Sequence, residues 1–192
     1  MKTKISSLLF IATMLLAGAT ASMSASSDAY EATISIFKNA GESGTYFGNS
    51  YAYAVFPTIG KGGLGVGGAH GSGRAYVQGA HVANVKVTQL SIGFQAGGQA
   101  FSQIVFFQDK RAFDEFSSGS FEFDATVQAV AITASATATA GTAGATAGAA
   151  GGKKDATTAG KYHKGMAVFT VAKGGLMYQA AVGGQKFSYK PK

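Results

Sequence analysis

Two lysines of this sequence stand in the same local setting. Lys61 precedes Gly62-Gly63 and Lys173 precedes Gly174-Gly175, and an apolar stretch follows each pair (KGGLGVG and KGGLMYQ). If both segments are loops at one end of a sheet, their ammonium groups stand beside pliant backbone, which suits an anionic lipid headgroup. The simpler alternative is two solvated turn lysines. With three further cations, the predicted lipid-binding residues are Lys61, Arg74, Lys110, Arg111 and Lys173.

A run of glycines follows the first of these lysines. It contains a literal G-x-G-x-x-G at residues 63–68, but that motif binds dinucleotides only where it joins a strand to a helix, and hairpin signals follow here. Leu64 and Val66 alternate with the glycines, which predicts a strand face without side chains. A helix, a second sheet or a ligand could approach such a face closely. The predicted close-approach glycines are Gly62, Gly63, Gly65, Gly67, Gly174 and Gly175.

Other side chains that could do chemistry do not form a pattern. The three histidines are far apart and lack metal-ligand spacing. No G-x-S-x-G nucleophile elbow is present. Carboxylates gather around one short predicted helix, where a solvated helix face explains them more simply than a paired-carboxylate enzyme. We therefore predict a non-enzymatic protein with no catalytic residue, metal site or cofactor. The carboxylates in question are Asp109, Asp114, Glu115, Glu122 and Asp124.

The composition is that of one globular domain. The chain has 192 residues, of which 13% are charged and 46% are hydrophobic, with 28 glycines, 2 prolines and no cysteine. The formal charge of +7 favours anionic surfaces, but the basic residues are too scattered to indicate a nucleic-acid partner. The lack of cysteine excludes disulfides and a lipidated N-terminal cysteine.

The first residues predict a signal peptide. Lys2 and Lys4 precede an apolar segment at residues 5–16 that is too short to span a bilayer, and small residues then lead to a cleavage site after Ala21, or after Ala25 as the second choice. The alternative is a buried N-terminal helix. We expect a signal peptide at residues 1–21, a single domain at residues 26–192, and a periplasmic or secreted protein that is not a lipoprotein.

The pattern along the rest of the chain predicts an α+β, mostly β fold of antiparallel glycine-rich sheets, in a sandwich or half-barrel. An amphipathic helix ends near Asn39, and Asp109 caps a short internal helix. Pro57 should end the first strand, and a turn is expected at residues 70–73. Residues 134–160, almost entirely Ala, Thr and Gly, predict a flexible insertion. Strands are expected at residues 51–56, 74–78, 82–90, 99–108, 121–123, 127–133, 166–172, 176–182 and 186–189.

The N-terminal helix needs a partner. Tyr30, Ile34 and Phe37 fall on one face at i, i+4 and i+7. The usual partner of such a face is the domain's own sheet, and a membrane surface is the rarer alternative.

Three blocks of the sequence resemble the SYLF domain, also called the Ysc84 actin-binding domain. They are AVFPTIGKGGLGVGGAHGSGRAYV, QLSIGFQAGGQAFSQIVFFQDKRAFDEF and FTVAKGGLMYQAAVGGQKF, and their order and spacing match over about residues 30–190. The resemblance implies binding of phosphoinositides or other anionic lipids, and an N-terminal helical part against a β-rich body. Eukaryotic members are described as actin-binding, a role that does not suit an exported chain. The chain departs from the family in lacking a lipobox cysteine and in its Ala/Thr/Gly insertion.

Two functions follow as hypotheses. The first is a non-enzymatic, exported lipid-binding domain that docks peripherally on anionic lipid or phospholipid surfaces through Lys61, Lys173 and neighbouring loops. The alternative is a structural or protein-interaction module of the cell envelope without a lipid ligand, which would use sheet edges and the insertion to contact a protein partner.

Overall fold

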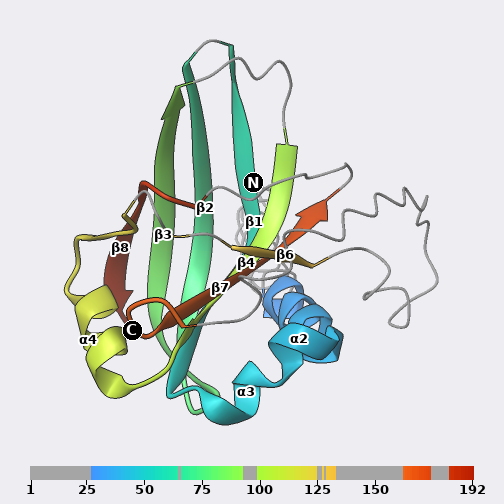
Figure 1. Cartoon of the computed structure of the whole chain (residues 1–192), viewed down its shortest axis with the longest axis vertical. Helices are drawn as coiled ribbons and strands as arrows, with labels where there is room; N and C mark the ends of the chain where they lie inside the picture. Colours follow the sequence, from blue (N-terminus) through green and yellow to red (C-terminus); the bar gives the residue numbers. More distant parts are fainter. Residues whose placement is uncertain are drawn as a thin grey trace, which may run out of the picture.

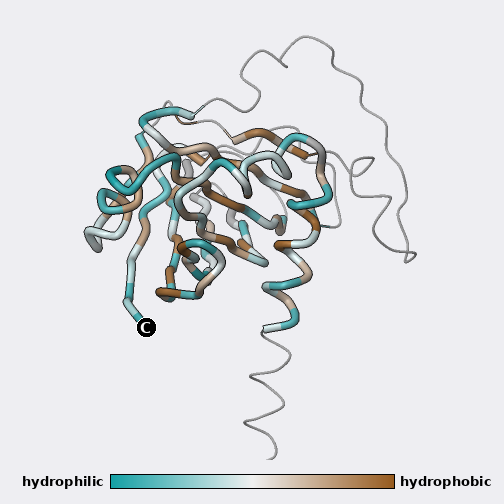
Figure 2. The backbone as a smooth tube through the Cα atoms, turned by 90° about the horizontal axis from the view of Figure 1, so that it is seen from below, coloured by the Kyte–Doolittle hydropathy of each residue, from teal (hydrophilic) through white to brown (hydrophobic). Residues whose placement is uncertain are grey.

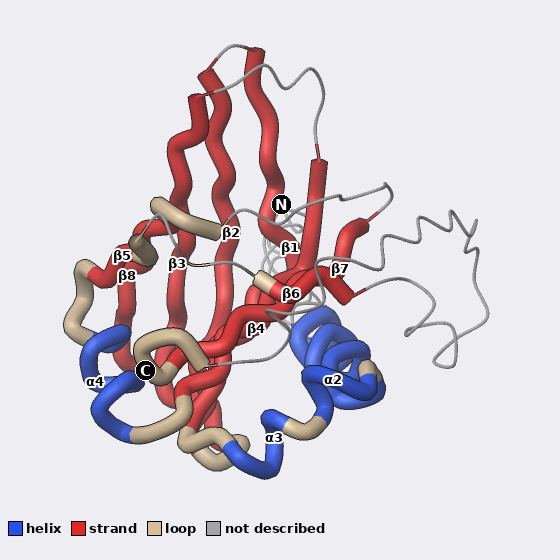
Figure 3. Tube along the Cα trace, viewed as in Figure 1, coloured by secondary structure: helices blue, strands red, loops and turns tan. Residues whose placement is uncertain are grey.

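The computed structural model describes residues 27–64, 66–92, 99–124, 127, 129–132, 162–173 and 182–192 (Figure 1). Several predictions lie outside these residues: the signal peptide, the insertion at residues 134–160, Gly65, and the Gly174-Gly175 turn with most of its return strand. Within the described residues the protein is mostly β with a few short helices, as the sequence predicts (Figure 3).

The described strands form one sheet in the order β5-β8-β3-β2-β1-β4-β7-β6. Neighbouring strands are antiparallel except β6 and β7, which are parallel. The strands are β1 (Ala52–Leu64), β2 (Val66–Val77), β3 (Ala80–Ile92), β4 (Gln99–Phe107), β5 (Phe121–Glu122), β6 (Val130–Ile132), β7 (Met166–Lys173) and β8 (Gln185–Pro191). The helices are one at residues 27–39, α2 (Gly41–Gly44), α3 (Tyr46–Asn49) and α4 (Lys110–Ser117).

The sheet curls into a half-barrel, and a pair of buried amides shows how strongly. Gln103 on β4 and Gln185 on β8 exchange two hydrogen bonds, Nε2 of each to Oε1 of the other, at 2.9 and 3.1 Å. In a flat sheet these two strands would lie roughly 19 Å apart, because three strands separate them. The side of the sheet that carries both amides is therefore the concave side, here called the inner face, and the opposite side is called the outer face.

The inner face encloses the larger of two apolar clusters. Phe56, Phe107 and Phe187 project into it from three strands, and none is more than 3% exposed. Helix α4 closes one end, with Phe116 packed 4.7 Å from Phe107 between ring centroids. Asp109 caps this helix, as predicted, by accepting a hydrogen bond from the Ala112 backbone N–H at 2.8 Å. Figure 2 shows the hydrophobic stretches concentrated at the centre of the molecule.

The second cluster lies between the outer face and the N-terminal helix. Tyr30 and Phe37 are buried against Val55, Ile104 and Phe169 of the sheet, and Ile34 packs at the edge of the same cluster. The N-terminal helix therefore packs with its apolar face on the domain's own sheet, and this face is not available to a membrane. No helix within the described residues is long and apolar enough to cross a bilayer.

Pro57 does not end the first strand, contrary to the prediction. β1 continues to Leu64, and its register against both neighbouring strands shifts around Pro57. A bulge leaves a residue out of the ladder, so the missing N–H of proline costs no hydrogen bond there. The Pro57 carbonyl accepts a hydrogen bond from the Ser102 hydroxyl at 2.8 Å instead.

The predicted turn at residues 70–73 is also wrong. These residues lie in the middle of β2, and the chain reverses at the Leu64–Val66 pair. Gly63 and Gly67 therefore stand opposite each other on two strands of a hairpin, not along one strand. The glycine motif leads into a strand and not into a helix, so the structure agrees with the rejection of a dinucleotide site. As a result β1, β2 and β3 are long and extend well beyond the rest of the sheet (Figure 1).

Candidate functional site

The five predicted cations do not gather in one place. Lys110 and Arg111 lie on α4, at the closed end of the half-barrel. Lys61, Arg74 and Lys173 belong to strands β1, β2 and β7. Only Arg74 and Lys173 share the outer face, as the strand register shows.

Lys61 and Lys173 lie at the same end of the sheet but on opposite faces. Lys173 pairs with Ala100, which pairs with Gly60, so Lys173 and Gly60 share the outer face. Lys61 is the next residue along β1, and strand alternation turns it to the inner face. Lys61 is half-buried, whereas Lys173 is exposed and donates a hydrogen bond to Thr58 Oγ1 at 2.8 Å. Lys61 lies within a strand, so the predicted pair of lysine loops is not what the structure shows.

The outer face carries a different group of cations, most of which the sequence reasoning missed. β3 and β8 pair so that Lys86 stands opposite Ser188, and Asn84 stands opposite Lys190. Both lysines are exposed, and neither forms an ion pair with another described residue. Lys186 lies on the same face and is held by Glu122 of β5 at 3.5 Å, the one carboxylate that the described strands place there. The exposed cationic side chains of the outer face are Lys86, Lys173, Lys186 and Lys190.

Uncharged polar residues and glycine occupy this face between the lysines. His70 pairs with Gly60 on one side and Thr88 on the other, and Ser72 pairs with Lys86. All of these residues are exposed. The outer face along β2, β3 and β8 is therefore polar and carries an excess of ammonium groups over carboxylates.

Arg74 is less accessible than these lysines. Its guanidinium lies over the Tyr30 ring, 4.2 Å from the centroid, where the N-terminal helix meets the sheet. Burial raises the pKa of Tyr30, and the nearby guanidinium opposes that rise. Arg74 therefore joins the helix to the border of the outer face.

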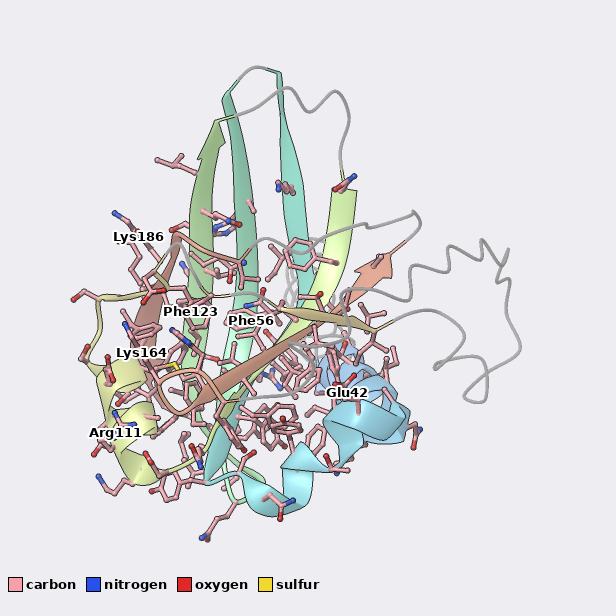
Figure 4. The ribbon with its side chains drawn as sticks, viewed as in Figure 1. Glu42, Phe56, Arg111, Phe123, Lys164 and Lys186 are labelled. Carbon is pink, nitrogen blue, oxygen red and sulfur yellow. The ribbon has the colours of Figure 1, made fainter. Side chains whose placement is uncertain are left out.

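The cations near α4 are engaged by carboxylates. Lys110 contacts Asp114 at 2.7 Å, and this hydrogen bond raises the pKa of Lys110. Lys164 contacts Asp124 at 2.6 Å with the same effect on its pKa. Arg111 lies 3.6 Å from Glu115. Figure 4 shows Arg111 and Lys164 on the α4 side of the molecule, and Lys186 farther along β8. These pairs also account for the carboxylates around α4, as surface ion pairs of a solvated helix.

The glycines differ in what lies beside them. A Cβ at Gly62 would meet nothing within 4 Å, so no described layer packs against this predicted close-approach glycine. Gly71 and Gly73 are the glycines of β2 that the fold requires. A Cβ at Gly73 would press on the Phe56 ring and lie 2.8 Å from the Val55 carbonyl oxygen, and one at Gly71 would lie 2.7 Å from Ile59 Cγ1. Of the other predicted glycines, Gly63 and Gly67 form the last glycine pair of the hairpin.

A hollow among the described residues lies beside the β2–β3 turn, at the end of these strands away from the Leu64–Val66 reversal. It has about 150 Å³ and lies between Lys38, Tyr53 and Gly79. Small-molecule sites usually have about 300–1,000 Å³, so this hollow is too small for one. No group of three or more His, Asp or Glu side chains within the described ranges could hold a metal ion.

Fold and surface together define a class: an α+β protein whose described strands form one sheet that curls around an aromatic-rich interior and presents lysines on its convex side. None of the known protein-family models matches the chain. The chain is similar to a protein of Aeromonas veronii named Beta cell expansion factor A, with 27% identity over 158 residues, which cover 81% of this chain and 52% of that protein. The chain thus spans about half the length of this relative. The resemblance to the SYLF domain stays a prediction.

Proposed function

We propose that this chain is an exported, non-enzymatic SYLF-like domain that binds anionic phospholipid surfaces through its outer face. The observation that carries the proposal is the exposed set of Lys86, Lys173, Lys186 and Lys190 on one convex sheet face, with Glu122 as the one carboxylate among the described strands of that face. Each lysine close to an anionic membrane contributes about 1 kcal/mol to binding. The resemblance of the three sequence blocks to the SYLF domain supports the same ligand class.

Vesicle co-sedimentation tests the proposal. The protein should pellet with phosphatidylcholine vesicles that contain phosphatidylglycerol and much less with phosphatidylcholine alone. Because the lysines are exposed, binding should weaken as salt rises towards molar concentrations, where the screening length falls to about 3 Å. Equal pelleting with both vesicle types, or none with either, would contradict the proposal.

A matched pair of double variants locates the surface. Lys86→Gln with Lys190→Gln removes two unpaired outer-face cations, and should lower affinity for the anionic vesicles by about tenfold or more. Lys110→Gln with Lys164→Gln changes the net charge equally but removes cations that carboxylates already hold near α4. This control should bind like the unaltered protein. If both variants lose affinity equally, net charge and not the outer face governs binding.

A further inference from the structure

The far end of the β1–β2–β3 ribbon differs from the face below it. Its last rows comprise residues 62–64, 66–68 and 90–92, here called the ribbon tip. The sequence places four aliphatic residues and no charge in it: Leu64, Val66, Leu90 and Ile92. Register brings them together, because Leu64 pairs with Val66 and Val66 pairs with Ile92.

Leu90 is exposed for a reason that lies in its neighbours. It pairs with Gly68, and Gly68 pairs with Gly62, so the two positions directly across the sheet from it carry no side chain to pack against it. Leu90 is 85% exposed, and no other large hydrophobic side chain whose exposure the structure describes is exposed. Full burial of a leucine is favourable by about 2 kcal/mol, so leaving this one in water is costly unless something covers it.

Cations border the tip. Lys86 lies four residues before Leu90 on the same strand and face, and Lys186 stands opposite Thr88, one row nearer to Leu90. At about 3.3 Å per residue, Leu90 lies roughly 13 Å beyond Lys86. A headgroup layer is about 5–8 Å deep, so a lysine can stay at the headgroups while the leucine reaches the acyl chains.

We propose that the ribbon tip inserts into an anionic phospholipid bilayer, with Leu90 among the acyl chains and with Lys86 and Lys186, the outer-face lysines nearest to it, at the headgroups. This inference rests on the proposed function and adds the depth and orientation of binding. The insertion is shallow. The described pairing of β3 with β8 stops at Gln89, and that of β1 with β4 stops at Lys61. Because hydrocarbon cannot satisfy backbone groups that lack a partner, we place the backbone of the tip in the interfacial layer and the Leu90 side chain among the acyl chains.

A single tryptophan tests the insertion, because the chain contains none of its own. In Leu90→Trp, fluorescence emission should shift to shorter wavelength on addition of phosphatidylglycerol-containing vesicles. Lipids brominated near the glycerol end of the acyl chain should quench it more than lipids brominated near the methyl end. Asn84→Trp is the control: it lies on the same strand and the same exposed face, roughly 20 Å away, and its emission should not shift.

Leu90→Asp supplies the second readout. It should lower affinity for these vesicles by at least tenfold while leaving the urea midpoint of unfolding unchanged, because the Leu90 side chain is 85% exposed.

Three outcomes would overturn insertion. The first is vesicle binding by the Leu90→Trp variant with no shift of its emission, which leaves the proposed function standing. The second is no vesicle binding at all, which removes both proposals. The third is an emission shift of the Leu90→Trp variant that grows with protein concentration in the absence of vesicles, which assigns the tip to a second copy of the chain.

Discussion

At the scale of single residues, the glycines show what sequence can and cannot reveal. A glycine-rich strand could be predicted from alternation. The positions at which a neighbouring side chain leaves no space for a Cβ, so that glycine is needed, could not be predicted. Gly71 and Gly73 are needed because Ile59 and Phe56 of the neighbouring strand occupy the space that a Cβ would take. Which glycine stands beside Ile59 or Phe56 depends on the register of the two strands. A shift of the turn by one residue would change that register and place other residues beside them.

Gly73→Ala should lower the free energy of unfolding by about 1–3 kcal/mol, because the added methyl group overpacks the Phe56 ring and the Val55 carbonyl. Urea denaturation followed by circular dichroism measures the change. The matched control is Gly60→Ala on the adjacent strand, where a Cβ would meet nothing within 4 Å. It should be neutral or slightly stabilising, since alanine lowers the entropy of the unfolded chain. Equal losses in both variants would refute the assignment.

The lysines also show that the sequence predicts the face of a residue on its own strand but not the neighbours of that strand. Lys86 lies in an alternating segment whose polar side is evident from the sequence, and Lys186 and Lys190 lie in another. Period two places each on the outward side of its own strand. What the sequence does not state is that β3 and β8 are neighbours, because about half of the chain lies between them. The shared repeat KGG drew attention to Lys61 instead, although alternation turns it away from Lys173.

At the scale of elements, local signals predicted most helices and strands well. The capping aspartate before α4 and the i, i+4, i+7 face of the N-terminal helix both act through neighbouring residues, and both predictions are confirmed. β4 and β7 follow their apolar runs almost to the residue. The failure at Pro57 arose because a bulge, which depends on two partner strands, removed the penalty that proline normally imposes.

The contact between β4 and β8 through Gln103 and Gln185 is a second element-scale feature, and it can be tested by a double-mutant cycle. Gln103→Met leaves the Gln185 amide buried without its partner, and should destabilise the fold by about 1–3 kcal/mol. Gln185→Met should do the same. The double variant should lose less than the sum of the two, with a coupling energy of at least about 0.5 kcal/mol from urea denaturation. Strict additivity would show that the amide pair does not stabilise the curl.

At the scale of the whole molecule, the fold class follows from the number and length of apolar runs, and a half-barrel was among the predicted arrangements. The strand order could not be obtained in this way. The sheet edges are made by β5 and β6, which are only 2 and 3 residues long, and short strands leave little periodicity to read. The sequence also did not predict how far β1, β2 and β3 extend beyond the rest of the sheet. The glycines in β1 and β2 were interpreted as turn residues, so the predicted strands were too short.

Stability should be uneven along those three strands. Residues 52–56 of β1 and residues 104–107 of β4 lie between the two apolar clusters, whereas the ribbon tip lies beyond both. Amide hydrogen exchange followed by mass spectrometry should therefore be slow in the body and fast at residues 62–64, 66–68 and 90–92. Each long strand offers an internal control, because peptides from its two ends are compared. Uniform protection along β2 would contradict this division.

The phenylalanines of the inner face bear on what the protein can carry. A lipid shuttle has to house an acyl chain in a dry cavity, and here Phe56, Phe107, Phe116 and Phe187 already occupy the space that the described strands enclose. An acyl chain could enter this space only by displacing these rings. Under the proposed function, the protein would therefore bind lipids at the surface of an assembled membrane, and its residence time would be set by the density of charge in the leaflet and not by the identity of any one chain.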